Sequence, residues 1–192
     1  MIGLKKGTVK LAVFDDSYKN KFEELFKDIS SILISYSVSI EHFGSSTIPN
    51  FIGKPIVDIV VGVHNEHEVN DIVTILGTSN YVFIGKHKKA KVFLFSLQEG
   101  GKTISIIHVL RHNSYAWKKY IAIRDYLIFS CDARSRYLEV KNYLQEKYKD
   151  DRASYTNKKR RFIVFLAREA FAWKKIVGET NGKIIKGQSF RK

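Results

Sequence analysis

The strongest candidate for a functional site in this sequence is a Gly-Ser turn followed by an aspartate. In Gly44-Ser45-Ser46, backbone N–H groups and two hydroxyls can converge on an anion, and a triphosphate is a natural guest. Lys54 adds a cation near this turn, and Asp58 follows Ser46 by twelve residues. Together these residues predict a phosphate-binding turn with a carboxylate beside it.

Asp58 is the only charge in the apolar run PIVDIVVGV, residues 55–63. This run is rich in β-branched residues, as expected of a strand buried on both faces. A charge there needs partners. Either Asp58 accepts hydrogen bonds from the Gly-Ser turn, or it is a ligand of Mg²⁺ or Mn²⁺, since hard oxygen donors suit such ions.

Glu41, His42 and His108 are further candidates for the same cleft. With Asp58 they would supply two acids and two imidazoles, a set that suits a transition metal or general acid–base work. Adjacent strand residues point to opposite faces, so Glu41 and His42 do not both enter easily. We favour His42, because alternation puts it on the side of Gly44. His108 is either a hydrogen-bonded core residue or a catalytic one.

Arg124 falls on the apolar face of a helix expected at 115–129. Its neighbour Asp125 faces elsewhere on a helix, so Arg124 reaches another carboxylate or a bound phosphate. Tyr155 can stack on a base and Lys158 can contact phosphate, or both can be ordinary surface residues. Arg124 and Lys158 are therefore candidate phosphate ligands.

The elements that position these residues follow from hydrophobic periodicity. A mixed sheet precedes a helical half, so we expect an α+β fold. A helix capped near Asp15 has apolar residues through Tyr36, and Gly100-Gly101 suits a hairpin turn. Strands are expected at 9–14, 37–43, 55–63, 81–84, 91–97 and 103–110, and further helices at 66–76, 115–129, 134–148 and 153–175.

Length and composition indicate one globular domain. The chain has 192 residues, 44% of them hydrophobic, enough to bury a core. We expect one domain over 1–177, sheet-rich in 1–112 and helical in 113–177, with a basic, flexible tail at 178–192. No apolar run is long enough for a membrane span and no secretory signal is present, so we expect a cytoplasmic protein with no membrane partner. The one cysteine, Cys131, forms no internal disulfide.

Positive charge is concentrated at the C-terminal end. The net charge is +14, and residues 158–192 contribute +9 of it. Such a patch can attract nucleic acid, nucleotide phosphates or an anionic surface, or it can be a solvated helix face with a loose tail. The charge therefore permits nucleic acid as a partner. The sequence has no basic strand surface studded with aromatic residues, which would favour that partner.

The segment EHFGSSTIPNFIGKPIVDIVV, 41–61, resembles the motif of the GrpB family, a bacterial group with the nucleotidyltransferase fold that is sometimes fused to dephospho-CoA kinase. The similarity continues in IIHVL around His108, in IRDYL at 123–127, and in Tyr155 with the lysines that follow it. It spans most of the chain. The resemblance implies a nucleotidyltransferase-like mixed sheet packed with helices and followed by a helical C-terminal half.

The resemblance also implies roles. The protein would bind a nucleoside triphosphate or related phosphate ligand with Mg²⁺ or Mn²⁺, and an active enzyme would transfer a nucleotidyl group to an acceptor that the sequence does not identify. Asp58 and His108 would be catalytic, and Asp58, His42 and Glu41 would be the metal ligands. The phosphates would lie against Gly44, Ser45, Ser46, Lys54, Arg124 and Lys158.

One departure from the superfamily pattern keeps other functions open. Nucleotidyltransferases usually carry two carboxylates separated by one apolar residue, but here Asp58 is followed by Ile59 and Val60. A third carboxylate normally comes from a later strand, which here brings His108. The sequence favours an enzyme, with two alternatives: a degenerate module that binds a nucleotide or anion without turnover, and a nucleic-acid-binding protein that uses the basic C-terminus.

Overall fold

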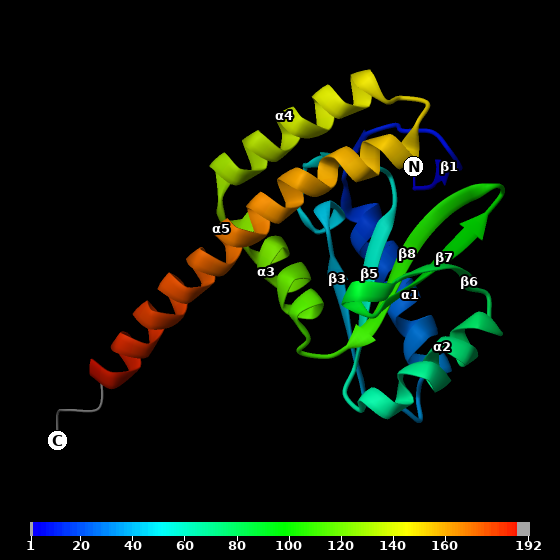
Figure 1. Ribbon diagram of the computed structural model, residues 1–192, viewed down its shortest axis with the longest axis horizontal. Coiled ribbons are helices and arrows are strands. Elements are labelled where there is room, and N and C mark those ends of the chain that lie inside the picture. Colours follow the sequence, from blue (N-terminus) through cyan, green and yellow to red (C-terminus); the bar gives the residue numbers. More distant parts are fainter. Residues whose placement is uncertain (1, 188–192) are drawn as a thin grey trace.

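The computed structural model describes the backbone of residues 2–187 and the side chains of residues 2–178. Its centre is a mixed sheet (Figure 1). In spatial order the strands are β3 (Val38–Phe43), β5 (Val57–Val63), β8 (Lys102–Arg111), β7 (Val92–Glu99) and β6 (Val82–His87), and β1 (Leu4–Lys5) also pairs with β8. β5 and β8 are parallel, and the other neighbours are antiparallel.

Strand β5 lies between β3 and β8, and its side chains alternate between two apolar layers. Ile59, Val61 and Val63 face the larger layer, formed with helices α1 (Asp16–Ile32) and α2 (Val69–Gly77). Val60 faces the other layer, which contains Trp117 of helix α3 (Tyr115–Phe129). Because strand side chains alternate with a period of two, Asp58 lies on the α3 side.

The start of α1 follows the predicted capping chemistry. Asp15 is its N-cap, and the Asp15 side chain accepts a hydrogen bond from the Ser17 backbone N–H at 3.0 Å. Before α1, strand β2 (Ala12–Val13) is shorter than the predicted strand at 9–14, because its only strand partner is the two-residue β4 (Ile52–Gly53). The predicted helix at 66–76 begins as a 3-10 turn, η2 (Glu66–Glu68), before α2.

Two long helices follow α3 in the part of the chain that the structure describes. Helix α4 (Cys131–Lys147) and helix α5 (Arg152–Gly187) lie side by side, and α5 also packs on α3, while its C-terminal end projects past the rest of the chain (Figure 1). We expected helix only to residue 175 and a tail from 178. The helix instead continues through Gly187, because residues 176–187 contain no proline and a helix once nucleated adds each residue cheaply. The remainder of the expected tail, 188–192, lies outside the described residues.

The α+β fold expected from the sequence is confirmed. Gly100 and Gly101 connect β7 to β8 with φ of 53° and 73°, as a tight hairpin turn requires. Within the described residues, no helix is long and apolar enough to cross a membrane.

Candidate functional site

A cavity of about 390 Å³ lies on the α3 side of the sheet, between the sheet and the C-terminal helices. Its wall on the sheet side comes from the turn after β3 and from β5 and β8. Its other walls come from α3, α4 and α5. We call it the cationic cavity, for the side chains that line it: Lys54, Lys141, Arg152, Lys159, Asp58, His108, Gly44, Ser45, Tyr120, Tyr137 and Tyr155, among others.

Gly44 and Asp58 touch at the base of the cavity. Phe43, which precedes the turn, is the register partner of Asp58 across β3 and β5. Gly44 has φ of 78°, and a Cβ atom placed on it would lie 2.7 Å from Asp58 Oδ2. Both the left-handed backbone and the close approach require glycine. The turn and the carboxylate that were linked by spacing are therefore in direct contact.

Gly53 provides a second close approach, and it brings in a helix that is distant in sequence. A Cβ atom on Gly53 would lie 2.8 Å from Ser45 Oγ and 2.9 Å from Lys141 Nζ. Lys141 extends from α4, is 1% exposed, and donates a hydrogen bond to the Ile52 carbonyl at 2.7 Å. The Gly-Ser turn, β4 and α4 therefore meet at Gly53, and Lys141 lies beside the Ser45 hydroxyl.

The cations of the cavity perturb one another. Burial lowers the pKa of Lys54 to about 7, with further lowering by Lys159 and Arg152. Burial also lowers the pKa of Lys141 well below its usual value, and repulsion from Lys159 adds to this. The Asp58 carboxylate opposes both shifts. Burial is the larger cause of both shifts and repulsion among the cations is the smaller one, whereas the pKa of Lys159 is raised, despite its burial, by Tyr137, Tyr155 and Asp58.

Asp58 is the one carboxylate among the lining residues. Removal from bulk water raises its pKa, against the lowering effect of Lys54, Lys159, Lys141 and Arg152. No described side chain donates a hydrogen bond to it, so its charge is balanced by surrounding cations at longer range. Asp58 is thus held among cations and not by the hydroxyls of the turn.

His108 lies over the same cavity in an aromatic setting. Its Nδ1 is 3.2 Å from the Tyr120 hydroxyl, and its ring packs edge-on against Phe43. Burial lowers the pKa of His108 to about 3, so the ring is neutral at pH 7 and a weak proton acceptor. This setting suits hydrogen bonding and packing better than proton transfer.

Tyrosine rings surround the lysines. Lys141 Nζ lies 4.4 Å from the centroid of the Tyr137 ring, and Lys54 Nζ lies 5.5 Å from that of Tyr155. Ring faces attract cations, so these contacts offset part of the cost of burying the ammonium groups. Tyr137 and Tyr155 also give the cavity flat apolar surfaces.

A second hollow lies beyond the Gly-Ser turn. This acidic cleft, of about 650 Å³, is lined by Asp15, Asp16, Glu23 and Asp125, with Lys19 and Arg124 as its cations, and also by His42 and Ser46. His42 stacks on Phe22 and its Nε2 is 2.9 Å from Ser46 Oγ. Burial lowers the pKa of His42 to about 4, with a contribution from Arg124. His42 and Ser46 therefore bond to each other away from Asp58.

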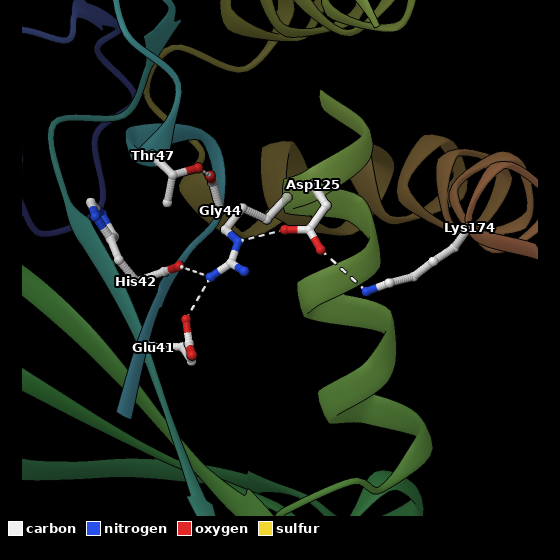
Figure 2. A network of polar contacts seen from close by, with 7 residues as sticks. Glu41, His42, Gly44, Thr47, Asp125 and Lys174 are labelled. Carbon is white, nitrogen blue, oxygen red and sulfur yellow. Dashed lines mark hydrogen bonds and ion pairs between the residues drawn. The ribbon is translucent and has the colours of Figure 1, made fainter. Parts of the chain in front are cut away.

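Arg124 of α3 binds the end of β3, and its partners Glu41, His42 and Asp125 are labelled in Figure 2. Its Nη1 donates to Glu41 Oε2 at 2.7 Å and to the His42 carbonyl at 3.0 Å, and its Nε donates to Asp125 Oδ1 at 3.0 Å. Lys174 of α5 pairs with the other Asp125 oxygen at 3.2 Å. Asp125 does reach Arg124, contrary to our expectation, because the long arginine side chain folds back along the helix. Arg124 is engaged in ion pairs with Glu41 and Asp125 and does not line the cationic cavity.

The structure brings some of the predicted residues together and separates others. Asp58, His108, Gly44, Ser45 and Lys54 line one cavity. The other predicted residues do not line it: Ser46, Arg124, His42, Glu41 and Lys158.

The preference for His42 over Glu41 fails for a reason of register. The register partner of His42 is Ile59, and that of Glu41 is Val60, so Glu41 is on the side of Asp58. Alternation counted from Gly44 misleads, because the strand conformation ends at the turn. Glu41 is nonetheless engaged by Arg124.

Sequence reasoning missed the cations contributed by the helices. Lys158 is exposed, whereas the adjacent Lys159 and the preceding Arg152 line the cavity. Lys141 had a usable signal, because it lies four residues after Tyr137 and three before Leu144, within the apolar stripe of its helix. A charge in such a stripe needs a reason, as Arg124 did.

The residues present do not fit the magnesium site that the resemblance implies. Val60 occupies the position two residues after Asp58, and the register partners of Asp58 are Phe43 and Ile106. No group of three or more His, Cys, Asp or Glu among the described residues is placed to hold a metal ion. A site for a divalent cation needs several oxygen donors, and here the surroundings of the one carboxylate are cationic.

Comparison with known proteins gives a consistent family and fold. A family model described as GrpB protein matches residues 8–169. The glutamate-rich protein GrpB of Alkalihalophilus pseudofirmus is 32% identical over 170 residues, which cover 85% of this chain and 96% of that protein. The crystal structure of GrpB from Enterococcus faecalis superposes with a TM-score of 0.75 at 22% identity, covering 86% of this chain and 99% of that one.

A more distant structure shares the fold. The GLD-2/RNP-8 complex superposes with a TM-score of 0.51 at 15% identity, over 75% of this chain and 57% of that chain. The fold is therefore nucleotidyltransferase-like, as the sequence predicted.

Proposed function

The chain belongs to the GrpB family, and from this premise we propose that it binds the phosphate groups of a nucleotide in the cationic cavity. One observation carries the proposal. Lys54, Lys141, Arg152 and Lys159 face a single carboxylate, Asp58, in a cavity built at a Gly-Ser turn. A surplus of positive charge in a partly buried cavity is stabilised by an anionic ligand.

The geometry around the turn supports a phosphate ligand in particular. Lys141 and the Ser45 hydroxyl lie next to each other across Gly53 and can donate hydrogen bonds to the same phosphate. Arg152 and Lys159 extend the donor set along α5. A triphosphate, with oxygens along its length, can satisfy donors that come from several elements.

The aromatic rings of the cavity flank the cations. Tyr155 is 1% exposed and Tyr137 is 4% exposed, and both line the cavity. Tyr137 already stacks on Phe51 and Phe162, and Lys54 and Lys159 lie over the ring of Tyr155. The cavity therefore supports a triphosphate group and assigns no base.

Nucleotidyl transfer is a second candidate function, favoured by the contact between Gly44 and Asp58. In that reaction an acceptor hydroxyl attacks the α-phosphorus, and the bond to the pyrophosphate leaving group breaks. Asp58 is the carboxylate that would take the hydroxyl proton.

Calorimetry of the full chain with ATP, GTP, CTP and inorganic triphosphate tests binding, and a pyrophosphate-release assay tests transfer. Lys141→Met should weaken triphosphate binding about 10- to 100-fold, since hydrogen bonds to charged groups contribute about 1.5–3 kcal/mol. Lys158→Met is the matched control, because Lys158 is exposed on α5 outside the cavity lining. Equal loss in both variants, with both folded by circular dichroism, would contradict a phosphate site in the cavity.

A further inference from the structure

The charges of the cationic cavity are reversed relative to those of a metal-dependent transferase. Such enzymes place carboxylates around two metal ions, and the ions neutralise the triphosphate. Here the positions that could supply further carboxylates hold other residues. Phe43 and Ile106 are the register partners of Asp58, and Val60 is two residues along the strand.

The next nearest positions on the flanking strands are also unavailable. Val60 pairs in register with Glu41 on β3 and with His108 on β8. Glu41 is bound by Arg124 at 2.7 Å, and His108 contacts Tyr120 and Phe43. No second carboxylate on the sheet can therefore join Asp58 without breaking the Arg124 ion pair.

The four cations come from elements outside the central sheet. Lys54 follows β4 and Lys141 is on α4. Arg152 and Lys159 lie on one side of α5. All four act electrostatically on Asp58. Lys141 is fixed by the Ile52 carbonyl and by the rings of Tyr137 and Phe51, at 4.4 and 4.5 Å from its Nζ. A cation held this rigidly in a buried position is pre-organised to receive an anion.

We propose that Lys54, Lys141, Arg152 and Lys159 take the place of the divalent ions, so that the cavity binds a triphosphate directly as the metal-free anion. This inference rests on the proposed function and specifies the state of its ligand. Mg²⁺ then weakens binding, because it removes negative charge from the triphosphate and is itself repelled by the four cations. In a metal-dependent transferase, Mg²⁺ strengthens binding.

Calorimetry with inorganic triphosphate and with ATP, first in EDTA and then with excess Mg²⁺, tests whether Mg²⁺ weakens or strengthens binding. In EDTA we expect binding, with affinity decreasing from triphosphate to pyrophosphate to phosphate. With excess Mg²⁺ we expect the affinity for triphosphate to be about tenfold lower, comparable to the loss of one charge contact. Binding that requires Mg²⁺ would overturn the inference and leave the proposed function intact. Binding in neither condition would overturn both.

Asp58→Asn gives a second test with an opposite expectation for the two accounts. Removing the one carboxylate should raise the affinity for triphosphate in EDTA about fivefold, since a negative charge near the ligand is lost. A carboxylate that holds a metal predicts a loss of affinity when excess Mg²⁺ is present and no gain in EDTA. Asp71→Asn, an exposed residue on α2 across the sheet, changes the net charge equally and should have no effect. If Asp58→Asn does not fold, the Mg²⁺ titration of the unaltered protein still decides the question.

Discussion

The cationic cavity and the acidic cleft lie on either side of one short turn and have opposite charge. The cavity sets four cations against Asp58, and the cleft sets four acids against two cations. Ser45 faces the cavity and Ser46 faces the cleft, although they are adjacent. The turn itself is uncharged, so the character of each hollow is decided by the elements packed against it.

Different helices give the two hollows their opposite charges. Helices α4 and α5 supply Lys141, Arg152 and Lys159 to the cavity, whereas the start of α1 supplies Asp15 and Asp16 to the cleft. Arg124 lies between them and holds the end of β3 against α3. The charge on each side of the turn is therefore set by different helices, and a substitution in one hollow can change its charge without changing the other.

Gly44→Ala should have the largest effect. A side chain at φ of 78° is strained, and its Cβ would lie 2.7 Å from Asp58 Oδ2, so the turn must shift away from the cavity. We expect triphosphate affinity to fall about 100-fold, a loss of about 2.7 kcal/mol, measured by calorimetry. Gly101→Ala is the matched control, because Gly101 has φ of 73° with nothing within 4 Å. Equal affinity losses in the two variants would show that strain alone, and not the Asp58 contact, matters.

Raising the pH should separate binding from stability. Lys54 has a pKa of about 7 in the free protein and is surrounded by Asp58, Lys159, Arg152 and the Tyr155 ring. An anion binds its protonated form, so triphosphate affinity should fall about tenfold between pH 7 and pH 9. A constant affinity over this range would contradict a role for Lys54 in binding.

The free energy of unfolding of the free protein should move in the opposite direction. The lowered pKa values of Lys54 and Lys141 mean that the unfolded chain binds more protons than the folded protein above pH 7. The contribution of these lysines to stability therefore rises with pH from about 7 toward their unfolded value. Urea unfolding at pH 7 and pH 9 measures it, and Lys54→Met should reduce the slope.

Arg124→Met should have an intermediate effect on triphosphate affinity, because Arg124 holds the turn that separates the two hollows. The change removes hydrogen bonds to Glu41, to the His42 carbonyl and to Asp125. We expect the free energy of unfolding to fall by about 2 kcal/mol and triphosphate affinity to fall about threefold, because the turn loses its anchor without losing a ligand. A loss of affinity of 100-fold with normal stability would instead make Arg124 a phosphate ligand.

Arg136→Met is the control for Arg124→Met. Arg136 pairs with Asp132 and Glu169, between α4 and α5 and away from the lining of both hollows. Its loss should affect stability in urea and leave triphosphate affinity unchanged.

Ser46→Ala should have the smallest effect on the cationic cavity. The change removes the hydrogen bond to His42, which contributes about 1 kcal/mol to stability, and should leave triphosphate affinity within about twofold. Ser45→Ala, one residue earlier, should lower the affinity about fivefold, because its hydroxyl lies beside Lys141. If both serines matter equally for binding, the division of the turn between two hollows is wrong.

Local patterns predicted the elements closely because each has a strong period and clear ends. The helix expected at 115–129 matches α3 residue for residue, and Gly100-Gly101 makes the expected hairpin. The weak point was the C-terminal helix, where a few glycines and polar residues do not end a helix that is already formed. The strand at 9–14 was overestimated, because its length depends on a partner strand that lies 40 residues away.

That a Gly-Ser turn precedes a buried strand with one aspartate can be predicted from the residues alone, because glycine, β-branched residues and a lone charge have local consequences. The surroundings of that aspartate depend on how distant segments pack. Lys141, Arg152 and Lys159 come from helices that begin more than 70 residues later, and the face taken by His42 depends on strand register across β3 and β5. Charge balance in a cavity is a sum over distant segments, and no local pattern contains it.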